Sequence, residues 1–181
     1  MARTRNVRLY SGLKLHGALT IHVFNAATGS VVRTLSNPNT IVDNAKDVVR
    51  SLLCQRALGA GGDPVNIYEY SWGSMRFGTS GTPPTATQDD LLAEVTTARK
   101  ELGDVQKVNG TLGEVTLTAT LESADANALV LREAGVFTRG PGLWSASIGG
   151  SLKMFSRQAH APIEKTSALR LEYTWVFQFT A

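Results

Sequence analysis

The C-terminal segment carries the pattern that most constrains the fold. Over residues 169–179, six large apolar side chains occupy every second position, and mostly polar residues separate them. Successive side chains of a β-strand point to opposite faces of a sheet, so this period of two predicts a strand with one continuous apolar face. Burial of such a face contributes on the order of 10 kcal/mol before entropy costs. We therefore expect this long strand to be central in its sheet.

Other segments repeat the strand signals at shorter length, with Gly, Pro and Asn turns between them. Gly135 falls inside one of these segments, where glycine indicates a bulge or a close backbone approach. This succession predicts a mainly β fold, either an antiparallel β-sandwich or a barrel-like domain. The further strands are expected over residues 18–24, from 31 onward, and over 115–121, 130–138, 143–148 and 152–159.

One amphipathic helix is expected, over residues 40–58. Thr40 is a suitable N-cap, and apolar residues recur at helical spacing from Ile41 to Leu52 before Gly59 provides a C-cap. A helix of this length could cover one face of a sheet. A shorter helical turn is expected over residues 89–92.

The chain has 181 residues and a formal net charge of +3, and Arg3, Arg5, Arg8 and Lys14 all come before any acidic residue. This length suits one domain. We assign residues 1–16 to a basic N-terminal arm and residues 17–181 to a single β-rich domain. A solvated or partner-docked arm is favoured over an arm that binds nucleic acid, because dense basic patches interleaved with aromatic residues are missing from the sequence. The sequence also has neither an apolar run of membrane-spanning length nor a signal-peptide core, so we expect synthesis in a host cytoplasm and no membrane partner.

Motifs for catalysis, metal binding and cofactor binding are not found. The three histidines are scattered, and the Gly-rich loops lack the spacing of phosphate-binding loops. Asp89, Asp90 and Glu94 could serve glycoside hydrolysis only if they faced one another across a cleft, and a helix N-terminus is the simpler interpretation. We therefore expect no enzymatic activity, no catalytic residues, no metal and no cofactor.

Two groups of residues are candidates for contacts with partners. The first is the set of arginines in the arm, and the second is an alternating aromatic run that suits a core or a subunit contact better than a sugar-binding groove. The candidate contact residues are Arg3, Arg5, Arg8, Tyr68, Tyr70 and Trp72.

Three stretches, taken in order, resemble tail-associated proteins of tailed bacteriophages, of the kind found in tail fibres, collars and baseplates. They are residues 77–84 with 89–92 and 99–101, then 115–121 with Asn127 and 131–137, and finally 162–166 leading into the alternating strand to Phe179. The resemblance covers roughly residues 40–180 and depends on the order of the motifs rather than on any one of them.

The resemblance implies a structural subunit of the virion with no catalytic residues. The chain shows no coiled-coil heptads, no collagen-like repeat and no receptor-binding tip, which favours a tail, neck, collar or fibre-anchoring adaptor over a complete fibre. The expected partners are other virion proteins and further copies of the chain. Two alternatives stay open: a capsid decoration or head-fibre protein, and a carbohydrate-binding module that uses the aromatic run.

Overall fold

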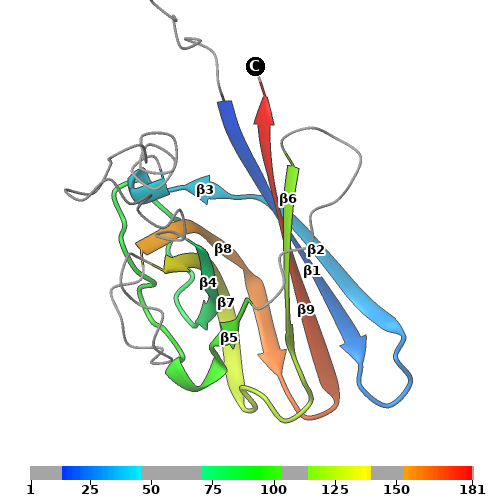
Figure 1. Cartoon of the computed structure of the whole chain (residues 1–181). Coiled ribbons are helices and arrows are strands. Elements are labelled where there is room, and N and C mark those ends of the chain that lie inside the picture. The colour runs from blue at the N-terminus through cyan, green and yellow to red at the C-terminus, as the bar shows by residue number, and fades with distance from the viewer. Residues whose placement is uncertain (1–13, 46–70, 103–113, 140–152, 181) are drawn as a thin grey trace, which may run out of the picture.

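A computed structural model describes residues 14–45, 71–102, 114–139 and 153–180, which form two antiparallel sheets (Figure 1). The mainly β prediction is confirmed, in the form of a β-sandwich. One 3-10 helix, η1 (Thr96–Ala98), interrupts the described strands. The strands are β1 (Lys14–Asn25), β2 (Val31–Pro38), β3 (Thr40–Ile41), β4 (Ser71–Gly78), β5 (Lys100–Glu101), β6 (Glu114–Leu121), β7 (Leu129–Arg139), β8 (Lys153–Lys165) and β9 (Leu169–Thr180).

The first sheet, sheet A, has the strand order β2-β1-β9-β6. Strand β9 therefore lies between two neighbours, as its alternation predicted, and it pairs with β1 along its whole length. Its buried side chains, such as Tyr173 and Trp175, face the second sheet, whereas Thr174 and Val176 point outward and are partly exposed. One strand thus supplies the centre of the core and the centre of an outer face.

The second sheet, sheet B, has the order β3-β8-β7-β4-β5. Strands β7 and β8 lose register twice, between Leu131 and Glu133 and between Val136 and Phe137. These irregularities flank Gly135, where a Cβ atom would lie 2.9 Å from the side chain of Leu91. The close approach that the sequence predicted at Gly135 is therefore confirmed.

The core lies between the two sheets and is rich in aromatic rings. Phe77 of sheet B packs on Tyr173 of sheet A with ring centroids 4.6 Å apart, and Phe155 meets Phe177 edge to face at 5.0 Å. Edge-to-face and tilted pairs at these separations are favourable beyond the area that they bury. The inner faces of the sheets are thus joined mainly by apolar contacts.

The chain crosses from sheet A to sheet B at Asn39, between β2 and β3. The Asn39 amide nitrogen Nδ2 donates to Ser156 Oγ at 2.7 Å, and its backbone N–H donates to the Gly17 carbonyl at 3.1 Å. A Cβ atom at Gly17 would collide with the Asn39 side chain, so any larger residue there would displace the amide that holds this corner. This corner explains why the predicted helix does not begin at Thr40: residues 40 and 41 pair with β8, and only residues 43–45 of the predicted helix are helical within the described part of the chain.

Two further features differ from the sequence predictions. Strand β1 begins at Lys14, so residues 14–16 belong to the sheet rather than to the arm. Residues 89–92 are an irregular segment instead of a helical turn. The predicted strand over 143–148 and residues 46–58 of the predicted helix lie outside the described residues.

Candidate functional site

The contact residues predicted from the sequence fall in two places. Arg3, Arg5, Arg8, Tyr68 and Tyr70 lie outside the described residues. Trp72 is half-buried at the start of β4, where its ring stacks on Phe177 with centroids 5.5 Å apart and meets Phe155 edge-on at 5.0 Å. At least one face of the Trp72 ring is therefore occupied by the core.

A long loop, residues 79–95, lies on the side of sheet B that faces away from sheet A (Figure 1). Leu91 is its buried anchor, and together with Val42, Phe137 and Met154 it forms a second, smaller hydrophobic cluster. The next residue, Leu92, is 51% exposed. The loop is thus held by one inward leucine and presents the following one to the surface.

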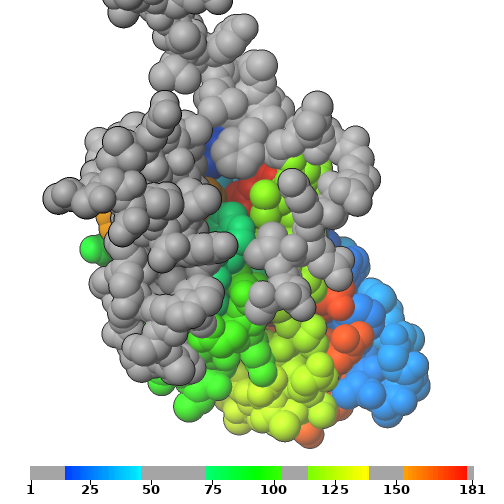
Figure 2. Space-filling view, viewed as in Figure 1, coloured from blue at the N-terminus to red at the C-terminus, as the bar shows by residue number. Residues whose placement is uncertain are grey.

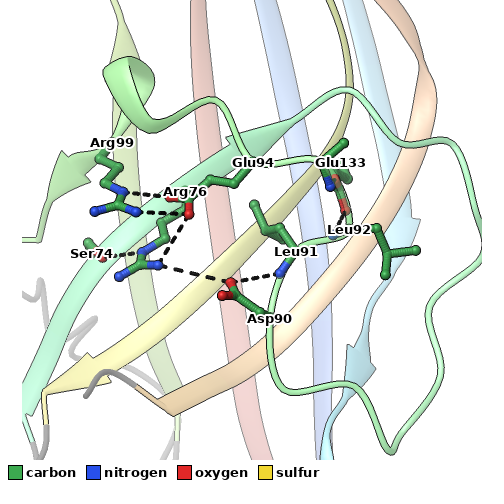
Figure 3. Close-up of polar contacts among 9 residues, drawn as sticks. Ser74, Arg76, Asp90, Leu91, Leu92, Glu94, Arg99 and Glu133 are labelled. Carbon is green, nitrogen blue, oxygen red and sulfur yellow. Dashed lines mark hydrogen bonds and ion pairs between the residues drawn. The ribbon is translucent and has the colours of Figure 1, made fainter. Parts of the chain in front are cut away.

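Glu133 is the polar centre that fixes this loop. Its carboxylate is fully buried on β7 and pairs with the equally buried Arg157 of β8, at 2.7 Å. The same carboxylate accepts hydrogen bonds from the backbone N–H groups of Leu92 at 3.3 Å and Ala93 at 2.8 Å (Figure 3). A buried charge is tolerated only when it is paired and hydrogen-bonded, and here both conditions are met.

Arg157 extends the same network toward the start of the loop. Its guanidinium donates to Gln88 Oε1 at 2.9 Å and to the Thr82 carbonyl at 3.1 Å. Gly78 completes the arrangement, since a Cβ atom there would collide with the Glu133 carboxylate. One ion pair therefore holds three separate points of the loop.

A second cluster of charges lies beside this network, around Arg76. Glu94 accepts from Arg99 at 2.6 Å and from Arg76 at 3.4 Å, and Asp90 lies 4.0 Å from Arg76 (Figure 3). Burial lowers the pKa of Arg76, while the hydrogen bond with Glu94 raises the pKa of Arg99. The interpretation of these acidic residues as a helix N-terminus was wrong: Glu94 and Asp90 pair with arginines, and Asp90 accepts from the Leu91 N–H at 2.8 Å.

Lys165 plays a comparable part at the turn between β6 and β7, residues 122–128. Its Nζ is buried and donates to Asn127 Oδ1 at 3.2 Å, to the Thr166 carbonyl at 3.0 Å and to the Ser123 carbonyl at 3.4 Å. Three acceptors match the three donors of an ammonium group. Lys165 thus acts as an internal tie for a turn in which Ala126 and Ala128 both adopt positive φ angles.

His160 is a buried titratable group in the core. It lies in the irregular part of β8, where its Nδ1 donates to the Ala161 carbonyl at 2.8 Å and its Nε2 faces the Tyr173 hydroxyl at 3.5 Å. Burial lowers the pKa of His160, nearby Arg33 lowers it further, and Glu133 opposes this. Complete burial raises the pKa of Tyr173, so both groups are neutral at physiological pH.

The lowered pKa of His160 predicts that the protein loses stability in mild acid. The unfolded chain takes up the proton near pH 6.5, whereas the folded chain resists it to lower pH, so the free energy of unfolding falls as the pH drops below about 6.5. The variant His160→Gln should show a shallower fall between pH 8 and pH 5 in urea titrations. The exposed His16 provides the control, and a His16→Gln variant that removed the slope while His160→Gln kept it would contradict this assignment.

The outward face of sheet A forms a second candidate surface. Its central row consists of four hydroxyl side chains that are neighbours across all four strands, namely Ser36, Thr20, Thr174 and Thr118. Thr20 lies 3.4 Å from Ser36, and Thr118 lies 3.5 Å from Thr174. At the edge of this sheet, Val31 and Val32 of β2 are 52% and 56% exposed. Figure 2 shows the hairpin of β1 and β2, in blue, at one end of the molecule.

Comparisons with known proteins found no match to this chain. No protein-family model matches the chain, and neither the curated proteins nor the solved structures give a match. Among the residues that the structure describes, no three histidine, cysteine or acidic side chains gather as a metal site would require. No helix in the described ranges is long and apolar enough to cross a bilayer.

Sequence reasoning missed the roles of Glu133, Arg157 and Lys165. Each is a charged residue in a strand. In an alternating pattern of apolar and polar residues, a charged residue is expected to face the solvent. The available signal was the sequence Glu-Ala-Gly at positions 133–135, in which an acidic residue precedes a glycine inside an otherwise apolar strand. That pattern indicates a place where another part of the chain closely approaches the backbone.

Proposed function

We propose that this chain is a structural subunit of a tailed-phage virion, in the tail, the neck or collar, or at a fibre anchor, and that it assembles in several copies. The observation that supports the proposal is that the three stretches resembling tail-associated proteins are tied to one another by buried polar groups. Glu133 of the second stretch binds the Leu92 N–H of the first, and Lys165 of the third binds Asn127 of the second.

The proposal assigns these buried polar contacts a structural role rather than a catalytic one. Both carboxylate oxygens of Glu133 are engaged by an arginine and two backbone N–H groups, and the Lys165 ammonium is engaged by three oxygen acceptors. Groups used in this way hold a loop and a turn in one conformation on a rigid sandwich. A fixed block with well-defined loops is what a subunit of a symmetric assembly needs.

The carbohydrate-binding alternative is weakened by the position of Trp72. A sugar-binding platform requires an open ring face, whereas Trp72 stacks on Phe177 with an interplanar angle of 5°. The head-decoration alternative differs from the proposal only in the location of the chain within the virion. The test that follows therefore distinguishes the two.

The direct test is composition and location in purified particles. We expect mass spectrometry of virions from the phage that encodes the chain to detect it in several copies, and particles lacking it to lose tail or neck density in electron micrographs. Intact tails with altered heads would move the chain to the head. Its absence from particles would overturn the proposal.

Removal of the arm should separate folding from assembly. Because β1 begins at Lys14, deletion of residues 2–13 spares every described strand. We expect the truncated chain to keep the circular dichroism spectrum and melting temperature of the full chain within a few degrees but to be lost from particles. Incorporation at the normal level would show that the arm makes no essential contact.

A further inference from the structure

The edges of the two sheets differ in how they are protected from pairing with a further strand. An edge strand presents unpaired N–H and C=O groups, and proteins usually protect it with a bulge, a proline, an inward-pointing charge or a covering segment. Sheet A ends in β2 and β6, whereas sheet B ends in the two-residue strands β3 and β5. Among the described residues, only the edge at β6 lacks such protection.

Strand β2 carries three of these protective features. Its pairing with β1 shifts register between Val23 and Phe24, which marks a bulge, and the strand ends at Pro38. Arg33 is the cross-strand partner of the buried Val23 and lies on the same inward side, where it donates to the Pro162 carbonyl at 3.3 Å. A further strand is therefore disfavoured along β2.

The edges of sheet B are protected as well. Beyond its short pairing with β3, strand β8 loses register against β7 and contains Pro162. On the opposite side of the sheet, β4 pairs with β5 and with the chain around it. The Val95 N–H donates to the Phe77 carbonyl at 2.8 Å, and the Leu102 N–H donates to the Gly73 carbonyl at 3.0 Å. These contacts occupy backbone groups of β4 that would otherwise be free.

Strand β6 is regular along its whole length. All eight of its residues pair with β9 in one unbroken register, and the strand contains no proline. Its inward side chains are apolar, with Leu117 and Leu121 buried, and threonines alternate with them on the outward side, where Thr118 is exposed. Glu114, at the first position, is its one charged residue. A flat strand of this composition is suited to pairing with another strand.

We propose that β6 pairs edge to edge with β6 of a second copy of the chain, in antiparallel direction about a two-fold axis at Leu117. The two copies of sheet A then form one continuous sheet of eight strands, four from each copy. Thr116 of each copy lies opposite Thr118 of the other, and threonine pairs across strands are favourable. An isologous contact of this kind closes on itself and leaves no β6 edge for further growth.

The charges around β6 select this occupant and this axis. A parallel, in-register pair would place the two Glu114 carboxylates side by side, which is destabilising. An antiparallel pair with its axis at Thr118 would set Glu114 opposite Glu122 of the other copy, with the same penalty. The axis at Leu117 sets Glu114 opposite Thr120 and keeps the two Glu114 residues about 20 Å apart, at roughly 3.3 Å per residue. The sequence of β6 is therefore complementary to itself in this arrangement.

The β6 dimer deepens the proposed function, which requires several copies of the chain, and it rests on that function in this respect. The test uses the purified full chain in sedimentation and light-scattering measurements over a range of concentrations. We expect a dimer whose dissociation constant rises at least about tenfold in Thr118→Lys, because a lysine on an edge strand opposes further pairing. Thr34→Lys, the matched change on β2, should leave the constant within about twofold. Both variants should keep the circular dichroism spectrum of the parent chain.

Cysteine cross-linking tests the position of the axis. In a background in which Cys54, the one cysteine of the chain, is replaced by serine, only introduced thiols can form a disulfide. A mixture of Thr116→Cys and Thr118→Cys chains should form a cross-linked dimer under mild oxidation, because opposite residues of paired strands lie within disulfide reach. Each variant alone should cross-link at least about fivefold less, because its two thiols lie diagonally across the strands.

Several outcomes would overturn the β6 dimer. One is a monomer at every concentration, and another is a dimer that persists in Thr118→Lys but dissociates in Thr34→Lys. Equal cross-linking by each single cysteine variant would overturn the axis at Leu117. A chain that is monomeric alone but binds another virion protein, and loses that binding in Thr118→Lys, would assign the β6 edge to a different partner. Failure of the proposed function is distinct, because it would appear as absence of the chain from particles.

Discussion

Replacement of Glu133 by glutamine is expected to lower the free energy of unfolding by about 3–5 kcal/mol. The substitution keeps the shape of the side chain but removes the charge that balances Arg157, and both side chains are fully buried. An uncompensated guanidinium in the interior is costly because no water can solvate it. Denaturant titrations followed by circular dichroism would measure the loss.

The same substitution should loosen the loop over sheet B. The neutral amide presents one oxygen acceptor where the carboxylate presents two, and Glu133 at present accepts from both Leu92 and Ala93. We expect the amide hydrogens of residues 92 and 93 to exchange faster with solvent in the variant. Amides in β9 should change only as far as global stability does.

Two variants make the Glu133 prediction decisive. Glu164 is an exposed glutamate one strand away, and Glu164→Gln should change the free energy of unfolding by no more than about 0.5 kcal/mol. The double variant Glu133→Gln/Arg157→Met removes both charges and should recover part of the loss. If Glu133→Gln alone cost less than about 1 kcal/mol, the ion pair would not hold the loop in the way the geometry indicates.

The sandwich was predictable from the sequence because its strands are half-buried. In β9, β6 and β1 the inward residues are apolar, and most of them are large, whereas most outward residues are polar or small, so a period of two appears directly in the residue order. The position of β9 at the centre followed from the length of its apolar face. The close approach at Gly135 followed from the absence of a side chain there.

The loop ties were not predictable, because they depend on contacts between distant parts of the chain. Gly135 indicates a close approach near Glu133 but does not say which part of the chain makes it. In other respects the buried Glu133 and the outward Glu172 look alike in the sequence, since both occupy alternate positions in strands. The start of the predicted helix failed for a similar reason. Thr40 and Ile41 fit a helical pattern by themselves, and the contact between Asn39 and Ser156, residues 117 positions apart, places them beside β8 instead.

The largest effect expected in the core belongs to Trp175. It is fully buried on β9, with Leu19 of β1 and Leu117 of β6 as its partners across the sheet and the Phe177 ring 6.4 Å away. We expect Trp175→Ala to lower the free energy of unfolding by about 3–5 kcal/mol, through lost contacts and the cavity that remains. Far-ultraviolet circular dichroism is the suitable readout, because the substitution also removes a fluorophore.

The indole N–H gives this position a sharper test. Trp175 Nε1 is buried and has no hydrogen-bond partner among the residues that the structure describes, a state that costs about 1–3 kcal/mol. Trp175→Phe removes the unpaired donor while keeping an aromatic ring, so its loss should be less than half that of Trp175→Ala. Trp72→Ala supplies the matched control, and its cost should be smaller than that of Trp175→Ala because Trp72 is only half-buried. If phenylalanine at position 175 were as costly as alanine, the indole nitrogen would have to be satisfied in the folded protein, and the core would be held at that point by a polar contact rather than by packing alone.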